Sequence, residues 1–450
     1  MGIRFNPGLK SMGINPDQIE KLIEAQAIPL KSAQKRRESV VKEKDEIDKL
    51  SQMITELDGI LNGLKTKYDF TKLKLDSSHP DIIDGSVQST ALIGTYELEV
   101  RSLAKAEKEL AYGFPDKDDY PVGFGFLYIE REDAEPLEID VEPYTTLQEL
   151  ATQINEEDAG VKAMVINTGY KPDAYRLIVI SEQSGKEAKL TVDEDTTFLE
   201  FKEQVTGRNL DVLFEDVPIT DTDNTMDELI DGVTLQARRS EPGTRVQISI
   251  LHDIDATVEM IAGFVEKYNQ IAEFISGQFK KDAETGSFGV LSGDSSIKFV
   301  MRQLQNALFA AAGNTQKYTT LAQVGITSEP RTGLLQMDES KVRAALSTDY
   351  EAVSKLFIRS SNSVGIADQL ANQIRRFRDP GSGVMKSRKR ALQKILESHD
   401  QDIERRQARL EQKEASIRQQ FTALEGTLAS LKGQSDFLKA KLGGGQNKGS

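Results

Sequence analysis

The residue types that could support catalysis or metal binding are few and scattered in this chain. Its three histidines, His79, His252 and His399, lie in separate segments, whereas zinc ligands recur at short, defined intervals. The chain contains no cysteine, which removes disulfides, thiolate nucleophiles and cysteine-ligated zinc. We therefore predict no catalytic, cofactor-binding or metal-binding residues, and a protein that is not an enzyme.

One acidic motif superficially resembles a calcium loop but lacks parts that calcium needs. The stretch DTDNTMDELIDG at 221–232 supplies Asp221 and Asp223 at the first and third loop positions. Thr225 and Met226 then occupy the fifth position and the position of the required turn glycine. The motif instead predicts a solvated turn followed by a helical segment.

Two further motifs resemble a nucleotide site and a glycosidase site. In VGFGFLYIE, Gly123 and Gly125 have no third glycine and no following helix start, so they are expected to mark a bulge or tight bend. Asp193 and Asp195 could flank a sugar, but carboxylates are abundant throughout this region. Neither motif supports catalysis.

Length and charge restrict the classes of protein to which this chain can belong. At 450 residues the chain predicts two to four domains. Its net charge of -15 is concentrated in residues 101–250, which carry 15 basic and 33 acidic side chains. Such a surface disfavours nucleic-acid binding, which requires clustered Lys and Arg. No apolar run is long enough to span a bilayer, and the N-terminus lacks a secretory signal, so neither a membrane protein nor a Sec-exported one is expected.

The elements that give this chain its shape are two heptad patterns, one near each end. Both step by four and three residues, the C-terminal one broken by Ser435. A narrow apolar stripe must pack against another helix, so we expect the segment from Val40 to Tyr68 to be the partner of the C-terminal stripe. An intrachain stalk and a stalk that also joins other subunits are equally compatible with the pattern. We name the N-terminal seam Ile47, Leu50, Ile54, Leu57, Leu61 and Leu64, and the C-terminal seam Ile417, Phe421, Leu424, Leu428, Leu431 and Leu438.

Other helix signals surround these seams. Asn15 can cap and Pro16 can open a shorter helix, which Pro29 is expected to interrupt. A long helix is predicted from Asp255, and the final helix is expected to run from about Lys389 to Leu442. Further N-caps are predicted at one of Asp294, Ser295 or Ser296, and at Asp338.

Between the helical ends, from about residue 84, alternating residues and turn signals predict short strands. TTLQELATQINEE is the one clear helix there, capped by Thr145 or Thr146. The fold class is therefore multidomain α+β: a coiled-coil or bundle stalk built from both termini and the 255–377 helices, with inserted β-rich head domains. We predict these domains: a flexible segment with a short helix (1–39), a stalk helix (40–75), a β-rich head domain (76–106 and 207–254), a nested second head domain (107–206), a helical stalk domain (255–377), a long C-terminal helix (385–442) and a flexible tail (443–450).

Several motifs, in order along nearly the whole chain, resemble one known family. SMGINPDQIEKLIEAQAIPL, GTYELEVRSLAKAEK, TMDELIDGVTLQA and VGITSEPRTGLLQMDESKVRAAL are each similar to its signatures. The closing RQQFTALEGTLASLKGQSDFL is the most specific, through Gln420, Phe421, Leu424, Glu425, Gln434, Ser435 and Leu438. The family is that of the flagellar filament cap, also called hook-associated protein 2. The acidic stretch EKELAYGFPDKDDYPVG matches no family pattern.

The resemblance implies a non-enzymatic role at the distal tip of the bacterial flagellar filament, where the protein would promote flagellin folding and polymerisation. Implied partners are flagellin, a homo-oligomeric ring of about four to six copies, hook-filament junction proteins and an export chaperone. The implied location is extracellular, after unfolded export through the flagellar type III system without a cleaved signal peptide. One alternative is a tip-located adhesin that binds host or surface glycans or proteins through the acidic head; a stalk-borne hydrolase is the weaker third.

Overall fold

The computed structural model confirms a multidomain α+β protein with helices from both ends of the chain and a β-rich region inserted between them. Asn15, the expected cap, and the predicted tail beyond Gly443 lie outside the described residues. The structure describes residues 16–131, 135–284, 286–310, 317–359 and 364–443.

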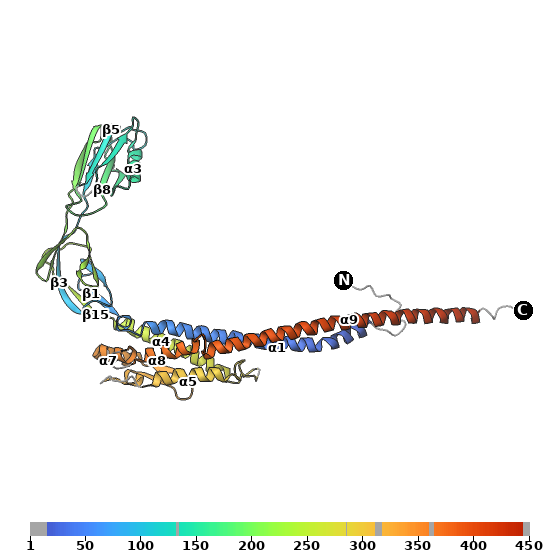
Figure 1. The fold of residues 1–450 in the computed structure, drawn as a ribbon. Coiled ribbons are helices and arrows are strands. Elements are labelled where there is room, and N and C mark those ends of the chain that lie inside the picture. Colours follow the sequence, from blue (N-terminus) through green and yellow to red (C-terminus); the bar gives the residue numbers. More distant parts are fainter. Residues whose placement is uncertain (1–15, 132–134, 285, 311–316, 360–363, 444–450) are drawn as a thin grey trace. The chain divides into compact units, whose positions relative to one another are not determined.

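The chain forms two compact units, which are described separately below (Figure 1). The helical unit comprises Met1–Lys65, Met260–Ala345 and Glu351–Ser450. The β-rich unit comprises Thr66–Glu259 and Leu346–Tyr350. The helix α4 (Ile254–Gln278) begins in the β-rich unit and continues into the helical unit.

The helical unit is built around two long helices that lie side by side, α1 and α9 (Figure 1). The shorter helices α8 and α5 pack along them. The elements are α1 (Pro16–Asn62), α5 (Ser295–Phe309), the 3-10 helix η2 (Leu321–Val324), β16 (Ile326–Ser328), β17 (Leu335–Met337), α6 (Glu339–Thr348), α7 (Tyr350–Phe357), α8 (Ile366–Arg378) and α9 (Val384–Gly443). The end of α6 and the first residue of α7 belong to the β-rich unit.

The predicted break at Pro29 is wrong, because α1 continues through this residue. A proline inside a helix removes one backbone hydrogen bond and costs about 3 kcal/mol. Contacts with α9 occur on both sides of Pro29: the Lys413 ammonium donates to Gln26 (2.8 Å), and Arg37 pairs with Asp400. Residues 16–39, expected as a separate short helix in a flexible segment, therefore extend the stalk helix.

The small hairpin of the helical unit is fixed by two neighbouring residues of α4. The Asn269 side-chain amide donates to the Leu335 carbonyl (2.8 Å) and accepts from the Leu335 amide (2.7 Å). The buried Tyr268 hydroxyl donates to the Gly333 carbonyl (3.3 Å), and burial raises the pKa of this phenol. As predicted, Asp338 caps the next helix, because its carboxylate accepts from the Lys341 amide (3.1 Å).

Among its described residues, the β-rich unit contains four antiparallel sheets and two short helices, α2 (Lys67–Phe70) and α3 (Leu147–Glu156). Its sheet orders are β1-β15-β3-β11-β12, β13-β14-β2, β10-β4-β8-β7 and β6-β5-β9. The strands are β1 (Leu73–Ser77), β2 (Ile83–Val87), β3 (Gly94–Ser102), β4 (Lys108–Ala111), β5 (Gly123–Arg131), β6 (Leu137–Val141), β7 (Val161–Asn167), β8 (Tyr175–Ser181), β9 (Leu190–Thr197), β10 (Phe201–Val205), β11 (Leu210–Phe214), β12 (Val217–Asp221), β13 (Thr225–Ile230), β14 (Val233–Ala237) and β15 (Val246–His252).

Two separate hydrophobic cores hold these sheets. The first β core draws on residues 82–104 and 210–250 and includes Leu98, Val212, Leu235 and Ile248. The second β core lies wholly within residues 111–201 and includes Leu127, Leu150, Leu177 and Val179. The chain therefore leaves the first core, completes the second, and then returns to the first.

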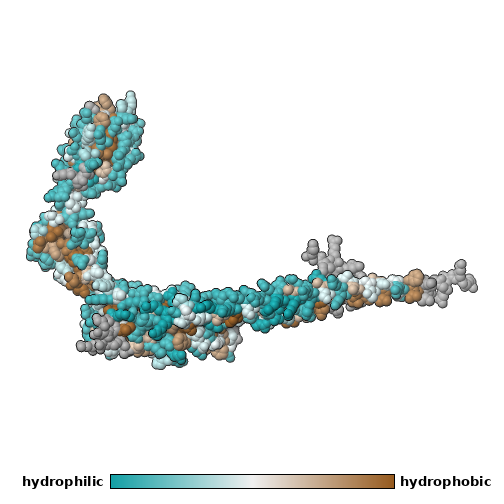
Figure 2. Space-filling model, viewed as in Figure 1, coloured by the Kyte–Doolittle hydropathy of each residue, from teal (hydrophilic) through white to brown (hydrophobic). Residues whose placement is uncertain are grey.

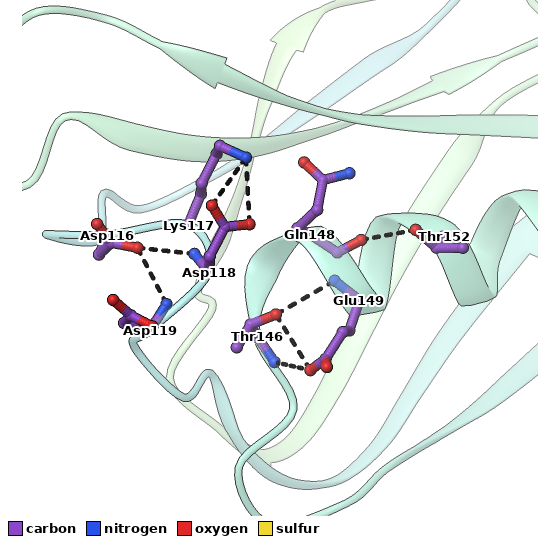
Figure 3. Close-up of polar contacts among 8 residues, drawn as sticks. All are labelled: Asp116, Lys117, Asp118, Asp119, Thr146, Gln148, Glu149 and Thr152. Atoms are coloured by element: carbon purple, nitrogen blue, oxygen red, sulfur yellow. Dashed lines mark hydrogen bonds and ion pairs between the residues drawn. The ribbon is translucent and has the colours of Figure 1, made fainter.

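The helix of the second β core begins at one of the two predicted caps, Thr146. Its hydroxyl accepts from the Glu149 amide (3.3 Å), while the Glu149 carboxylate accepts from the Thr146 amide (3.0 Å) (Figure 3). This reciprocal capping box satisfies two donors at the helix start. In the nearby acidic loop, hydrogen bonds from the Asp118 and Asp119 amides lower the pKa of Asp116 (Figure 3).

The glycines of VGFGF mark a bulge, as predicted, whereas the helical segment expected after Asp223 is wrong. The β5–β9 register shifts between Gly123 and Phe126, and both Gly123 and Gly125 have positive φ. Residues Thr225–Ile230 form β13, which pairs with β14 through a turn at Gly232 (φ 74°). Cross-strand pairing overrides the helical tendency of this short segment because it satisfies the backbone and buries Met226.

Candidate functional site

The N-terminal seam forms the most completely buried stripe of the helical unit. Ile47, Leu50, Ile54, Leu57, Leu61 and Leu64 each have 0% of their surface exposed. Complete burial requires neighbours on several sides, which the surrounding helices supply. The six residues are therefore the core of a helical bundle within one chain.

Polar contacts along the edges of α1 identify the helices that cover this seam. Asp58 accepts from Arg378 of α8 (3.4 Å), and Glu56 accepts from Lys267 of α4 (3.0 Å). Gly63 lies next to Met260 of α4, since a Cβ there would meet its sulfur at 3.6 Å. The seam from Leu50 onward therefore faces α4 and α8.

The part of α1 that precedes Leu50 packs instead against the first part of α9. Lys389 pairs with Asp48 (2.7 Å), and Arg37 pairs with Asp400 farther along. The partner of Asp48 is Lys389, and the partner of the earlier residue Arg37 is the later residue Asp400. The two helices are therefore antiparallel. Burial opposes ionisation of Asp48, but hydrogen bonds from Lys389 and Lys44 outweigh it and lower the pKa of this carboxyl.

One arginine of α9 joins three helices. The Arg388 guanidinium donates to Asp294 Oδ2 (2.6 Å) and also to Glu43 of α1. Asp294 is the N-cap of α5, since its Oδ1 accepts from the Ser296 amide (2.8 Å). Arg388 and Asp294 therefore fix α5 and α1 against α9.

The C-terminal seam lies mostly beyond this bundle. Ile417, Phe421 and Leu428 are half-buried, whereas Leu424, Leu431 and Leu438 are 45%, 54% and 55% exposed. On α9, Lys413 still contacts α1, through Gln26 near the described start of that helix. Apolar side chains remain visible on the end of α9, which continues past the described start of α1 (Figure 1 and Figure 2).

The expected pairing of the two seams is wrong. The antiparallel register brings Asp48 to Lys389 and Gln26 to Lys413, so the part of α1 from Val40 to its end does not meet α9 at the C-terminal seam. A heptad repeat looks the same after each shift of seven residues, so the stripe does not define the register. The ion pairs of Arg37, Arg388 and Lys389 define it.

Some stalk residues lay outside the predicted seams. Ala33 on α1 is fully buried, and Met385, Leu392 and Leu396 on α9 are nearly so. Steps of seven back from Val40 reach Ala33, and steps of seven back from Leu424 reach Leu396, whereas Met385 and Leu392 lie one residue off the extended repeat. The polar contacts of Arg388 and Asp294 carry no sequence signal of this kind.

The scattered histidines have separate local environments. His252 stacks on Tyr350 (3.7 Å between ring centroids), and His79 Nδ1 lies 3.0 Å from the Ser78 hydroxyl. Across the described ranges, no group of three His, Cys, Asp or Glu residues could hold a metal ion. In the same ranges, no helix is long and apolar enough to cross a membrane.

Comparison with known proteins gives consistent matches at both ends of the chain. The family model "Flagellar hook-associated protein 2 C-terminus" matches residues 207–433, and "Flagellar hook-associated protein 2 N-terminus" matches residues 13–107. The first of these alone covers more than half of the chain. Neither match includes residues 108–206.

Individual relatives also match this chain over most of their own length. The B-type flagellar hook-associated protein 2 of Pseudomonas aeruginosa is 26% identical over 371 residues, 76% of each chain. Flagellar hook-associated protein 2 of Escherichia coli is 24% identical over 411 residues, 86% of this chain and 87% of the relative. The solved D1-D2-D3 domains of the E. coli flagellar cap protein FliD share the fold, with a TM-score of 0.61 and 23% identity over 77% of this chain and 99% of that one.

Proposed function

The chain belongs to the flagellar hook-associated protein 2 family, and we propose that it caps the distal tip of a bacterial flagellar filament and promotes flagellin folding and polymerisation there. The cap is the role of this family, whose members lie at the flagellar tip. The proposed action is structural and uses binding surfaces, with no catalytic group.

The observation that carries the proposal is the exposed C-terminal seam. Leu424, Leu431 and Leu438 repeat at seven-residue spacing along one face, and a regular apolar stripe in water is costly unless a partner covers it. We propose that α9 beyond Lys413 is a leg that binds flagellin and neighbouring subunits. The fully buried N-terminal seam acts as its rigid support. The contacts with flagellin and neighbouring subunits, which form and break during assembly, are therefore made by the end of α9.

The finer partner assignments rest on the family. The protein would form a homo-oligomeric ring of about four to six copies and would meet the hook-filament junction proteins and an export chaperone. It would leave the cell through the flagellar type III export system. Neither nucleic acid nor membrane is a proposed partner, which agrees with the acidic residues 101–250.

We also propose that residues 107–206 form a nested head domain within a first head domain of residues 76–106 and 207–254. Two separate hydrophobic cores support this division. So does the gap between the two family models, which spans residues 108–206. The stalk divisions at 255–377 and 385–442 remain proposals of the same kind, whereas the helix expected at 40–75 spans Pro16–Asn62.

The adhesin alternative has no support, because every relative named above is a hook-associated or cap protein. No described feature of the β-rich unit separately favours binding of a host glycan or protein.

The experiment that tests the cap proposal deletes the gene and follows flagellin. Without a cap, monomeric flagellin is expected in the medium, and purified protein added to the filaments is expected to restore elongation. A variant with Leu424→Ser, Leu431→Ser and Leu438→Ser should fold yet fail to restore growth. Matched substitutions off the seam, Thr422→Ser, Ala429→Ser and Lys432→Ser, should restore it.

Normal filament growth in the deletion strain would reject the cap role. Full restoration by the seam variant would reject the leg contact while leaving the cap role intact.

A further inference from the structure

The chain passes between the first and second β cores through two segments, one leading in and one leading out. Residues 105–111 lead into the second core and include β4, and residues 201–208 lead out of it and include β10. They run antiparallel, with the Lys105 amide donating to the Arg208 carbonyl (2.8 Å) at the end near the first core. We call these two segments the joint.

Three carboxylates gather on one face of the joint. Glu109 of β4 lies directly opposite Glu203 of β10 in the strand register. Glu107 precedes Glu109 by two residues, so both project from the same face. Glu107 and Glu109 are 2% and 8% exposed, and the Glu107 carboxylate accepts a hydrogen bond from the Gly207 amide (3.2 Å).

The paired positions bring no cation to this face. Lys108 and Lys202 alternate with the acids and therefore project from the opposite face. On the other side of β4, β8 places Val179 opposite Glu109. Strand β9, which also packs near β4, contributes the half-buried acid Glu194.

Polar neighbours do not neutralise the carboxylates either. The Ser181 amide donates to the Glu107 carbonyl (3.1 Å), but the Ser181 hydroxyl is buried with no hydrogen-bond partner. The Arg208 guanidinium Nε donates to the Leu103 carbonyl (3.1 Å), and the Thr206 hydroxyl donates to Glu203, the most exposed of the three acids. The joint therefore pairs two strands while holding acids against each other.

Like charges directly opposite each other weaken strand pairing, and a buried carboxylate is costly to ionise. Burial, with smaller contributions from Glu107 and Glu203, raises the pKa of Glu109 from 4.5 to about 7. A raised pKa in the paired state means that this state holds its proton more tightly than the open state does. The proton on Glu109 thus stabilises the paired strands. This stabilisation is fully present below pH 4.5 and is lost as the pH rises through about 7.

We propose that the joint is a proton-controlled hinge, in which protonated Glu109 allows β4 and β10 to pair and loss of that proton loosens the attachment of the second β core. The acids of the joint then set how stiffly this core is held, according to the pH around the protein. The inference uses only the β-rich unit and holds whether or not the cap proposal does.

Hydrogen exchange of the full-length protein tests the hinge, measured from about pH 5.5 to about pH 8.5 and corrected for the intrinsic exchange rate. Opening of residues 105–111 and 201–208 is expected to rise by roughly tenfold or more over this range. Strand β7, in the same core, is the internal reference and should change little. Glu109→Gln should remove the pH dependence while keeping the protection seen at low pH.

The control variant is Glu138→Gln, which neutralises an exposed carboxylate on β6 and should leave the pH dependence as in the unmodified protein. Glu203→Gln provides a second test: removing one opposing charge lowers the pKa of Glu109, so the opening transition should be smaller. Exchange in the joint that is independent of pH, or an unchanged transition in Glu203→Gln, would overturn the proposal. A folded Glu109→Gln protein that retains the pH dependence would overturn it as well.

Discussion

Tyr350 shows how one side chain joins several segments within the β-rich unit. It is 7% exposed, and its hydroxyl donates to the Phe70 carbonyl (3.0 Å), accepts from the Lys72 amide (3.2 Å) and lies 3.0 Å from the Thr257 hydroxyl. Its ring stacks on His252. Burial raises the pKa of the phenol, against the opposing effect of the hydrogen bonds from Thr257 and Lys72.

Tyr350→Phe is expected to lower the free energy of unfolding of the β-rich unit by about 1–3 kcal/mol, because it leaves buried polar groups without a partner. Urea unfolding followed by hydrogen exchange of the neighbouring strands would measure the change. The matched control is Tyr68→Phe, since Tyr68 is 64% exposed and its loss should have little effect. Equal losses in both variants would contradict the assigned role.

The same residue predicts a response to alkaline pH. Because the pKa of Tyr350 is raised above its ordinary value of 10.0, the folded protein keeps this proton when the unfolded chain releases it. Stability should therefore fall as the pH rises above about 10. The fall should be shallower in Tyr350→Phe, and an identical slope in both proteins would contradict the prediction.

Asp294 carries the corresponding role in the helical unit, as N-cap of α5 and partner of Arg388. Asp294→Ala should cost about 2 kcal/mol, from the lost cap and from a partly buried guanidinium left with fewer partners. Hydrogen exchange of α5 amides measures this loss. Asp45→Ala, at an exposed position of α1, should change stability by no more than about 0.5 kcal/mol.

At the scale of elements, the two seams have the same heptad spacing but different surroundings. α1 packs against α8 and α9 and is hydrogen-bonded to α4 through Glu56 and Lys267, while α9 extends beyond the contact of Lys413 with α1. Identical leucines therefore contribute differently to stability. The surrounding helices, and not the heptad pattern, decide the contribution.

Leu57→Ala and Leu424→Ala make this difference measurable. Leu57 is fully buried, so its truncation should cost about 2–5 kcal/mol through lost burial and a cavity. Leu424 is 45% exposed, so its truncation should cost no more than about 0.5 kcal/mol in the isolated protein. Thermal unfolding followed by the helical circular dichroism signal compares the two. Similar losses would mean that the C-terminal seam is already covered before assembly.

At the scale of the whole molecule, the chain returns to the first β core after completing the second. The Lys105 and Arg208 backbones are hydrogen-bonded where it leaves and re-enters, so the insertion has closely spaced ends. Closely spaced ends allow a domain to be added or removed with little loss of loop-closure entropy.

Replacing residues 107–206 by a short Gly-Ser linker is therefore expected to leave the first β core and the helical unit folded. Hydrogen exchange protection of β3, β11 and α1 should stay within about threefold of the full-length protein. The control deletion removes a similar length across both cores, residues 150–249, and should abolish protection of β3. Loss of the first core in the linker variant would reject the nested division.

The sequence by itself determined the elements whose signals are local. Asp338 caps a helix as predicted, and the glycines of VGFGF mark a bulge. Thr146 and Asp294 are the caps among the neighbouring candidates that the sequence left open. The α+β class and both seams follow from periodicity, which depends only on near neighbours. The family motifs, which are also short and local, predicted the cap role.

Only the tertiary structure decided which distant surfaces meet. A heptad stripe allows many registers, so the pairing of Lys389 with Asp48 and the exposure of Leu424 could not be read from spacing. Pro29 stays helical, and residues 225–230 form a strand, because contacts from far along the chain outweigh local preference. The opposition of Glu109 and Glu203 depends on a strand register set by the fold of the whole β-rich unit.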